Sequence, residues 1–185
     1  KPTPRWRLLI GKYVGVVFFV GSQAALFIVL TWLALGIRTG IWDMRYWWCI
    51  PFLLLEFAVF YSFSVFLGVL TRSTVACVFG SLLFWLLAWA INFGSAMAPG
   101  HLDSDTMPSS TTRLAQAAYW ISPKPIDAGL VLFNALGAEE HFDKPIIFKI
   151  VEAQGFSPLL SILSSVLLAA ALLALSAYEF RAKDY

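Results

Sequence analysis

Long apolar blocks, separated by shorter polar segments, dominate the chain. No Asp, Glu, Lys or Arg occurs at residues 13–37, 73–102 or 153–178, and the block at 46–71 contains a single acidic residue, Glu56. Each block exceeds the roughly 20 residues that a helix needs to cross a bilayer. One ionisable residue does not disqualify a span. The pattern therefore predicts four transmembrane helices.

The spacing between the blocks predicts how the spans are connected. A turn around Arg72 separates the second span from the third, so these two are expected to form an antiparallel helical hairpin. The expected organisation is a basic cytoplasmic segment at 1–12, three spans within 13–93, an extracytoplasmic loop at 94–157, and a last span with a cytoplasmic tail at 158–185.

The long loop contains its own helical signals. Its first part, residues 98–112, is rich in Pro, Gly, Ser, Thr and Asp and should be irregular. Apolar residues at helical spacing then predict two short amphipathic helices, one on each side of Pro123 and Pro125. A third is predicted from Asp143, as its N-cap, to Gly155. Helices of this kind lie on membrane surfaces, so the predicted fold is an all-α, polytopic transmembrane bundle with four spans and short interfacial helices.

The distribution of basic residues predicts the orientation. With the N-terminus in the cytoplasm, the inner segments hold their basic residues close to the span ends: Lys1, Arg5, Arg7, Lys12, Arg72, Arg181 and Lys183. The outer basic residues are spread over longer stretches, and this asymmetry favours a cytoplasmic N-terminus. Four spans return the C-terminus to the same side. A net charge of +2 is too small to indicate a nucleic-acid partner.

Small and polar residues within the spans predict how the helices pack. Gly11 and Gly15 at the start of the first span let a second helix approach closely, as do the small residues of the last span, Ser161, Ser165 and Ala169. Gln23 needs a hydrogen-bond partner inside the protein because the bilayer offers none. Cys49 and Cys77 lie at opposite ends of the hairpin, about 30 Å apart, and are expected to be free thiols.

Glu56 is the strongest candidate for an intramembrane functional group. It lies about nine residues into its span, ~13 Å along the helix from the outer end, so it must face the bundle interior, a water-filled cavity or a partner. A functional role and a purely structural role are both open. Ser64, eight residues further along, is a candidate for the same polar stripe.

The other groups of polar residues are weaker candidates for a functional site. Glu139, Glu140, His141 and Asp143 are metal-ligand types, but their spacing matches no closed zinc or calcium pattern, and His101 stands alone. These residues are interpreted as a solvated loop. The phosphate-binding pattern GxxxxGK[ST] and the common hydrolase motifs are absent from the sequence. Any ATP chemistry must therefore belong to another chain.

Four features, in order, carry a family resemblance: PRWRLLIGKYVG at the start, the hairpin around LTRS, the loop YWISPKPIDAGLVLFNAL, and a terminal span with a basic tail. This order resembles the C-terminal part of the permease subunit of an ATP-binding-cassette (ABC) transporter of the second membrane-domain, exporter type. In that family a segment of the form P-x-x-R-x-x-x-L-x-G-K lies in the cytoplasm between the second and third of six spans. The residues that align with it are Pro2, Arg5, Leu9, Gly11 and Lys12.

The resemblance implies a function and partners. The chain would be the C-terminal two-thirds of a six-span permease in the plasma (inner) membrane, dimeric with a second permease copy and surrounded by lipid. It would carry no cofactor and no enzyme activity, because ATP and Mg²⁺ bind the separate ATPase subunit. Arg5, Trp6 and Arg7 would contact that subunit. The substrate is unknown. Two alternatives stay open: a membrane-embedded enzyme that uses Glu56, with His101 or His141 at the outer surface, and a structural or assembly subunit.

Overall fold

The computed structural model describes residues 5–97, 114, 117–153 and 155–182, and this part of the chain is helical without any strand. The predicted all-α class is confirmed. The elements, in order, are α1 (Arg5–Thr39), the 3-10 helix η1 (Met44–Trp48), α2 (Cys49–Thr71), α3 (Thr74–Met97), α5 (Pro125–Ala135), the 3-10 helix η3 (Ala138–Glu140), α6 (Ile146–Ala153) and α7 (Pro158–Ala182). Residues 117–121 are also helical.

Four helices are long and apolar enough to cross a membrane, namely α1, α2 together with η1, α3 and α7. The prediction of a multi-pass membrane protein with four spans is therefore confirmed. The basic segment predicted at residues 1–12 is not separate from the first span, because α1 runs without a break from Arg5 to Thr39. No helix breaker occurs between Arg5 and Tyr13 other than Gly11, so the basic segment continues the first span.

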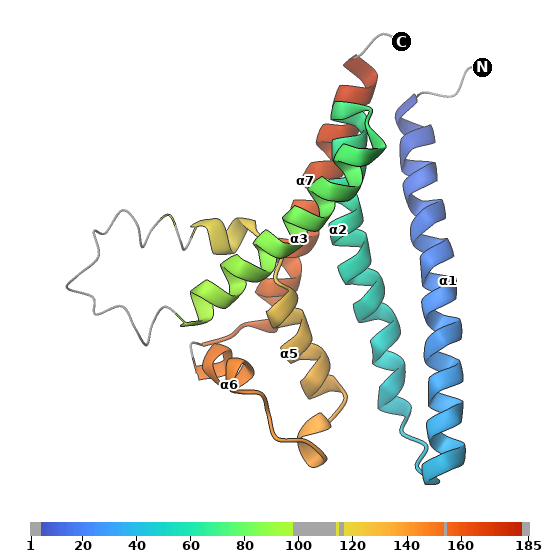
Figure 1. The fold of residues 1–185 in the computed structure, drawn as a ribbon, viewed down its shortest axis with the longest axis vertical. Helices are drawn as coiled ribbons and strands as arrows, with labels where there is room; N and C mark the ends of the chain where they lie inside the picture. Colours follow the sequence, from blue (N-terminus) through green and yellow to red (C-terminus); the bar gives the residue numbers. More distant parts are fainter. Residues whose placement is uncertain (1–4, 98–113, 115–116, 154, 183–185) are drawn as a thin grey trace, which may run out of the picture.

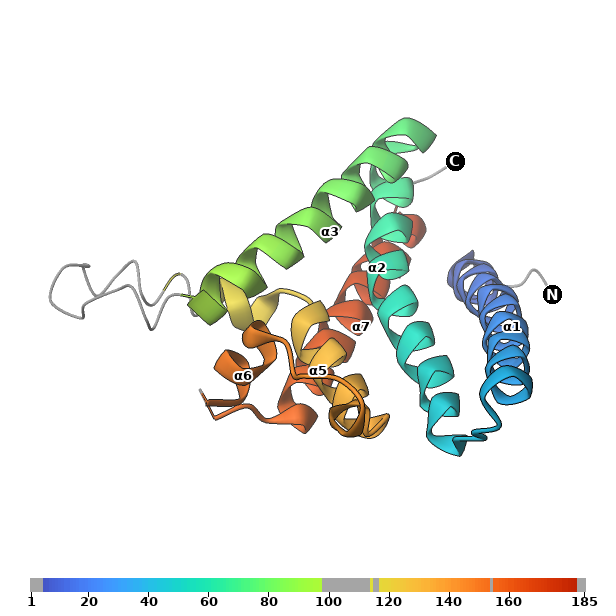
Figure 2. The ribbon, with the colours of Figure 1, turned by 60° about the horizontal axis from the view of Figure 1, so that its bottom comes forward.

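The central helix of the bundle is α2, which packs against α1, α3 and α7. Figure 1 shows the start of α1, the turn between α2 and α3, and the end of α7 at one end of the molecule, here called the terminal end. The opposite end, called the loop end, carries η1, η3 and α6. From the terminal end α3 diverges from α2, and Figure 2 shows α5 and α6 in the region that this divergence leaves open.

Aromatic rings and glycines bring α2 close to its two neighbours in sequence. On the α1 side, the Tyr13 hydroxyl donates to the carbonyl oxygen of Ala58 at 2.8 Å, and Gly21 faces the side chain of Leu54. On the α3 side, the rings of Phe63 and Phe84 stack with centroids 4.0 Å apart. These contacts confirm the predicted hairpin of α2 and α3.

Two of the small residues predicted to pack do not do so within the described chain. A Cβ added at Gly11 or Gly15 would have no heavy atom within 4 Å. Gln23 is also exposed, and its amide forms no hydrogen bond among the described residues. Gly21, two residues before Gln23, faces α2, so Gln23 lies on the opposite side of α1. In this chain α1 therefore directs its central amide away from the bundle.

The loop-end helices differ from expectation in burial and in one boundary. Within α5, Ile126 and Leu130 are fully buried and form a small core with Ala96 and Val151, so α5 is covered more deeply than a helix lying on a membrane surface. The N-cap predicted at Asp143 is wrong: α6 begins at Ile146 because a residue that precedes proline, here Lys144, disfavours helical geometry.

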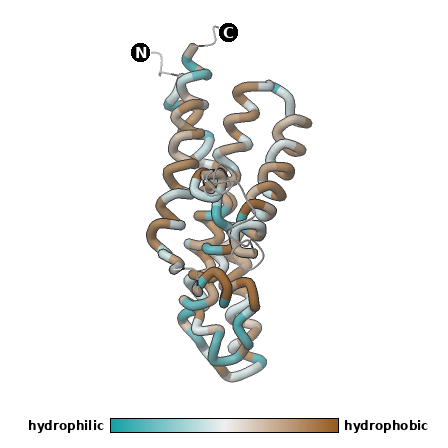
Figure 3. Tube along the Cα trace, turned by 90° about the vertical axis from the view of Figure 1, so that its left-hand side faces the viewer, coloured by the Kyte–Doolittle hydropathy of each residue, from teal (hydrophilic) through white to brown (hydrophobic). Residues whose placement is uncertain are grey.

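The remaining sequence predictions about local structure are confirmed where they fall within the described residues. Gly155, with a φ of +80°, lies just beyond the end of α6, as predicted. Cys49 and Cys77 are free, also as predicted. The irregular stretch at 98–112 and His101 lie outside the described residues. Figure 3 shows hydrophilic residues concentrated at the loop end, and predominantly hydrophobic residues along the long helices.

Candidate functional site

The most polar part of the protein interior is built around the turn between residues 117–121 and α5. Pro123 and Pro125 end one helix and begin the next, since proline is tolerated in the first turn of a helix but not in its interior. Lys124, between them, has φ −116° and ψ 71° and is the N-cap residue of α5. We call residues 119–130 the strap, because they lie between α3 and α7 and contact both.

Lys124 is buried, with 2% of its surface exposed. Its Nζ donates a hydrogen bond to Ser164 Oγ at 2.9 Å, and its backbone N–H donates to Ser165 Oγ at 3.3 Å. The ammonium also lies 4.5 Å from the ring centroid of Tyr119 and 3.8 Å from that of Trp120. Cation–π contacts of this kind compensate in part for lost hydration. Burial lowers the pKa of Lys124, while the charge of Asp127 acts in the opposite direction.

Asp127, in the first turn of α5, is buried next to the lysine, with 1% of its surface exposed. Its Oδ2 accepts two hydrogen bonds, from the Tyr119 hydroxyl at 2.7 Å and from Ser161 Oγ at 2.6 Å. Burial and the bond to Asp127 raise the pKa of Tyr119. The phenol therefore stays protonated and remains a donor to the carboxylate.

Asn92 ties the strap to α3. Its Nδ2 donates to the carbonyl oxygens of Ala88 and Pro123, both at 2.8 Å. These two acceptors fix the amide orientation, because a flipped amide would place its oxygen against both carbonyls. The Oδ1 atom is then buried without a hydrogen-bond partner among the described residues. An unsatisfied buried acceptor costs about 1–3 kcal/mol.

The strap inserts between the helices and does not lie across their ends. Ser161 and Ser165 follow the start of α7 by three and seven residues, which corresponds to ~5 and ~10 Å along a helix. Asn92 precedes the end of α3 by five residues, or ~8 Å. A lysine and an aspartate are therefore held among membrane-length helices by hydroxyl, amide and aromatic groups.

The basic residues predicted to contact a partner lie in the first turn of α1. Arg5 is the first residue of that helix, and Trp6 and Arg7 are both exposed. The Arg7 guanidinium carbon lies 5.5 Å from the centroid of the Trp6 ring. These side chains are on the terminal end, far along α1 from the strap.

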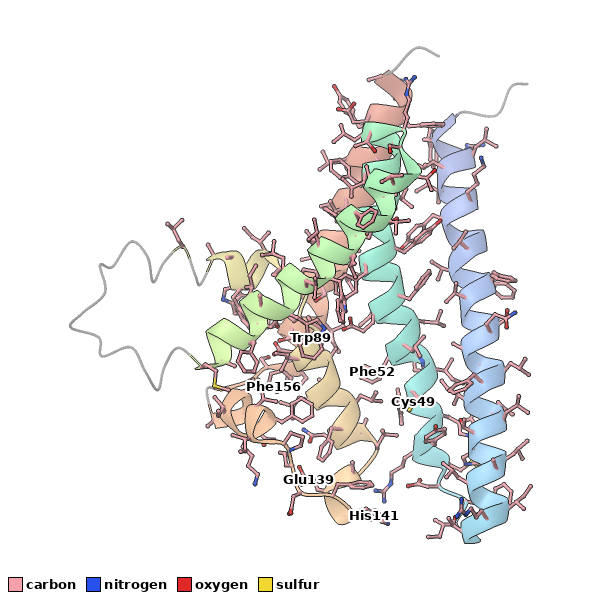
Figure 4. All side chains as sticks on the ribbon, in the orientation of Figure 1. Cys49, Phe52, Trp89, Glu139, His141 and Phe156 are labelled. Atoms are coloured by element: carbon pink, nitrogen blue, oxygen red, sulfur yellow. The ribbon has the colours of Figure 1, made fainter. Side chains whose placement is uncertain are left out.

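Glu56 and Ser64 both lie in α2 and are half-buried. Among the described residues, the Glu56 carboxylate has no ion pair or hydrogen bond. Phe52, one turn before Glu56 on the same side of α2, points toward the region beside α5 (Figure 4). The fully buried serine of α2 is Ser62, which bonds within its own helix to the carbonyl of Val59.

Three acidic residues of the loop end, Glu139, Glu140 and Glu152, are engaged in ion pairs. Arg45 of η1 pairs with Glu140 at 2.9 Å. Lys144 pairs with Glu139, and with Glu152 at 2.8 Å. In the part of the chain that the structure describes, no group of three or more His, Cys, Asp or Glu residues is placed to hold a metal ion. Figure 4 shows Glu139 and His141 at the extremity of the loop end.

Sequence reasoning missed Lys124, Asp127 and Asn92. It placed the first two in an extracytoplasmic loop with short interfacial helices and did not predict that they are buried. A usable signal was present: Lys124 lies between two prolines, Asp127 follows it by about one helical turn, and the last span offers serines at positions 161, 164 and 165. The serine stripe was interpreted only as a packing surface, although Ser161 and Ser165 also bond the strap.

The comparisons with known proteins add no assignment: no protein family, curated protein or solved structure matches this chain.

Proposed function

We propose that this chain is part of the membrane-spanning permease subunit of an ABC transporter of the exporter type, driven by ATP that a separate subunit hydrolyses. The observation that carries the proposal is the composition of the terminal end. The described basic residues there include Arg5, Arg7, Lys12, Arg72 and Arg181, and the first turn of α1 also carries an exposed Trp6. A permease without a nucleotide site needs such an exposed surface to receive motion from its ATPase.

The same residues support an orientation. Lys and Arg close to span ends favour the cytoplasmic side, so the terminal end would lie in the cytoplasm and the loop end outside. In a bacterial cell this places the protein in the inner membrane. Arg5, Trp6 and Arg7 are then the proposed contact with the ATPase subunit.

The outward face of α1 supports association with a second permease copy. Gln23 is exposed in the middle of a span, where hydrocarbon offers no hydrogen-bond partner. A glutamine amide both donates and accepts, so two copies related by a twofold axis satisfy each other. Gly11 and Gly15 leave room for the approach of a second helix.

The proposed contact is tested by purifying the complete parent protein in mild detergent. The purified complex is then assayed for ATPase activity and for a co-purified subunit that contains a phosphate-binding loop. Charge reversal at Arg5 and Arg7 should release the ATPase. The matched control is Arg38→Glu, an exposed arginine at the opposite end of the same helix, which should leave the complex intact. A parent protein that neither retains nor stimulates any ATPase would refute the proposal and favour the alternatives, a Glu56-dependent enzyme or an assembly subunit.

A further inference from the structure

The strap is the principal link between the loop-end halves of α3 and α7. Within the described residues, no Cα of α3 lies within 8 Å of a Cα of α7, whereas both helices approach α5 this closely. At the terminal end the two helices are instead held by their common neighbour α2. The separation of α3 and α7 near the loop end therefore depends on the strap.

The bonds on the two sides of the strap are of different kinds. On the α3 side the tie is a single amide, Asn92, beside the apolar contact of Ala96 with the core of α5. On the α7 side three serines bond the strap, Ser161 through Asp127, Ser164 through the Lys124 ammonium and Ser165 through the Lys124 amide. Both charged side chains of the strap thus bond α7, and among the described residues neither bonds α3.

A network of this kind favours two discrete arrangements. Buried ionic groups are tolerated only while their partners are in place, and a partly satisfied network is less favourable than an apolar core. A small displacement of α7 would leave Lys124 and Asp127 buried without their serine partners. The strap must then either stay fully bonded or separate far enough for water to reach both charges.

We propose that the strap is a conformational switch that sets the separation of α3 and α7 at the loop end, with the serine contacts of Lys124 and Asp127 as the element that opens. The inference rests on the fold alone and does not depend on the proposed transport function. In the open state the loop-end halves of the two helices move apart, while α2 keeps their terminal-end halves in place.

Distances between spin labels test the switch in the full parent chain, reconstituted in lipid nanodiscs after both native cysteines are replaced by alanine. One pair, Phe93→Cys with Leu160→Cys, reports on the loop-end halves of α3 and α7. A second pair, Val75→Cys with Tyr178→Cys, reports on the terminal end. All four positions are exposed.

Asp127→Ala is the main perturbation, and Ser161→Ala is a milder one that retains the Tyr119 bond. Both should add longer distances to the loop-end distribution and leave the terminal-end distribution unchanged. Ser176→Ala is the matched control, because that buried serine of α7 bonds only its own helix at Leu172. The switch is refuted if the loop-end distances in both variants equal those of the wild type, or if both label pairs broaden equally.

Discussion

Removal of one hydroxyl group, in Ser161→Ala, measures how strongly the strap is held. Ser161 is 6% exposed, and its Oγ lies 2.6 Å from Asp127 Oδ2. A hydrogen bond to a charged group contributes about 1.5–3 kcal/mol to stability. Because Asp127 keeps its second bond, from Tyr119, we expect a loss near the lower end of that range, about 1.5–2 kcal/mol.

Ser176→Ala makes the same chemical change on the same helix. Ser176 is fully buried, but its hydroxyl bonds the carbonyl of Leu172 one turn earlier. Such a bond within a helix stabilises little, and alanine is the better helix former, so the expected change is below about 0.5 kcal/mol. The difference between the two variants isolates the tertiary hydrogen bond from the loss of a serine.

The free energy of unfolding is measured by titration with SDS in mixed micelles, followed by tryptophan fluorescence and circular dichroism. Equal stabilities of the two variants would refute the reasoning, since they would mean that the contact with Asp127 adds nothing beyond a local bond. A double-mutant cycle with Asp127→Ala gives the coupling energy directly.

Three further predictions follow from the same contacts. Burial lowers the pKa of Lys124 in the folded state, so the unfolded state binds the additional proton and stability should rise with pH as the unfolded pKa of about 10.4 is approached. Thermal unfolding at a series of pH values should show that Lys124→Met removes this rise. Parallel curves for the two proteins would contradict the prediction. Gly21→Ala would place the new Cβ 2.8 Å from a terminal methyl of Leu54, which must shift, so it should be less favourable than Gly15→Ala, which has no atom within 4 Å and should be neutral or stabilising in the same unfolding assay. Glu56→Gln removes a half-buried carboxylate that has no partner among the described residues. We therefore expect unchanged or higher stability together with reduced transport in the parent protein. A large loss of stability would show that Glu56 is structural.

Much of the fold was predictable because membrane spans are encoded locally. The length of an uncharged block is set by bilayer thickness, so the four long helices followed from composition alone, and the turn at Arg72 was enough to predict the hairpin of α2 and α3. The breaks at Pro123 and Pro125 and the end of α6 near Gly155 followed from backbone chemistry. The position of Glu56 within a span was equally a property of the sequence.

The site at the strap could not be predicted in the same way. Lys124 and Asp127 have the composition of a polar loop, and the residues adjacent to them in sequence do not by themselves decide whether they are buried. Their serine partners in α7 lie 34 to 41 residues away, and Asn92 in α3 bonds the neighbouring Pro123 carbonyl from 31 residues away. Whether a charged residue is hydrated or bonded inside the protein depends on which distant groups the fold brings to it.

The sequence by itself determined that the protein crosses a membrane, how many described helices do so, and most of their ends within a few residues; the start of α1, eight residues before the predicted span, was the exception. Only the tertiary structure decided that the segment after the third span returns between α3 and α7, and that Gln23 faces outward while Lys124 faces inward. The physical reason is that transfer into a bilayer is nearly a sum over neighbouring residues, whereas the satisfaction of a buried polar group is a property of pairs that the chain brings together from a distance.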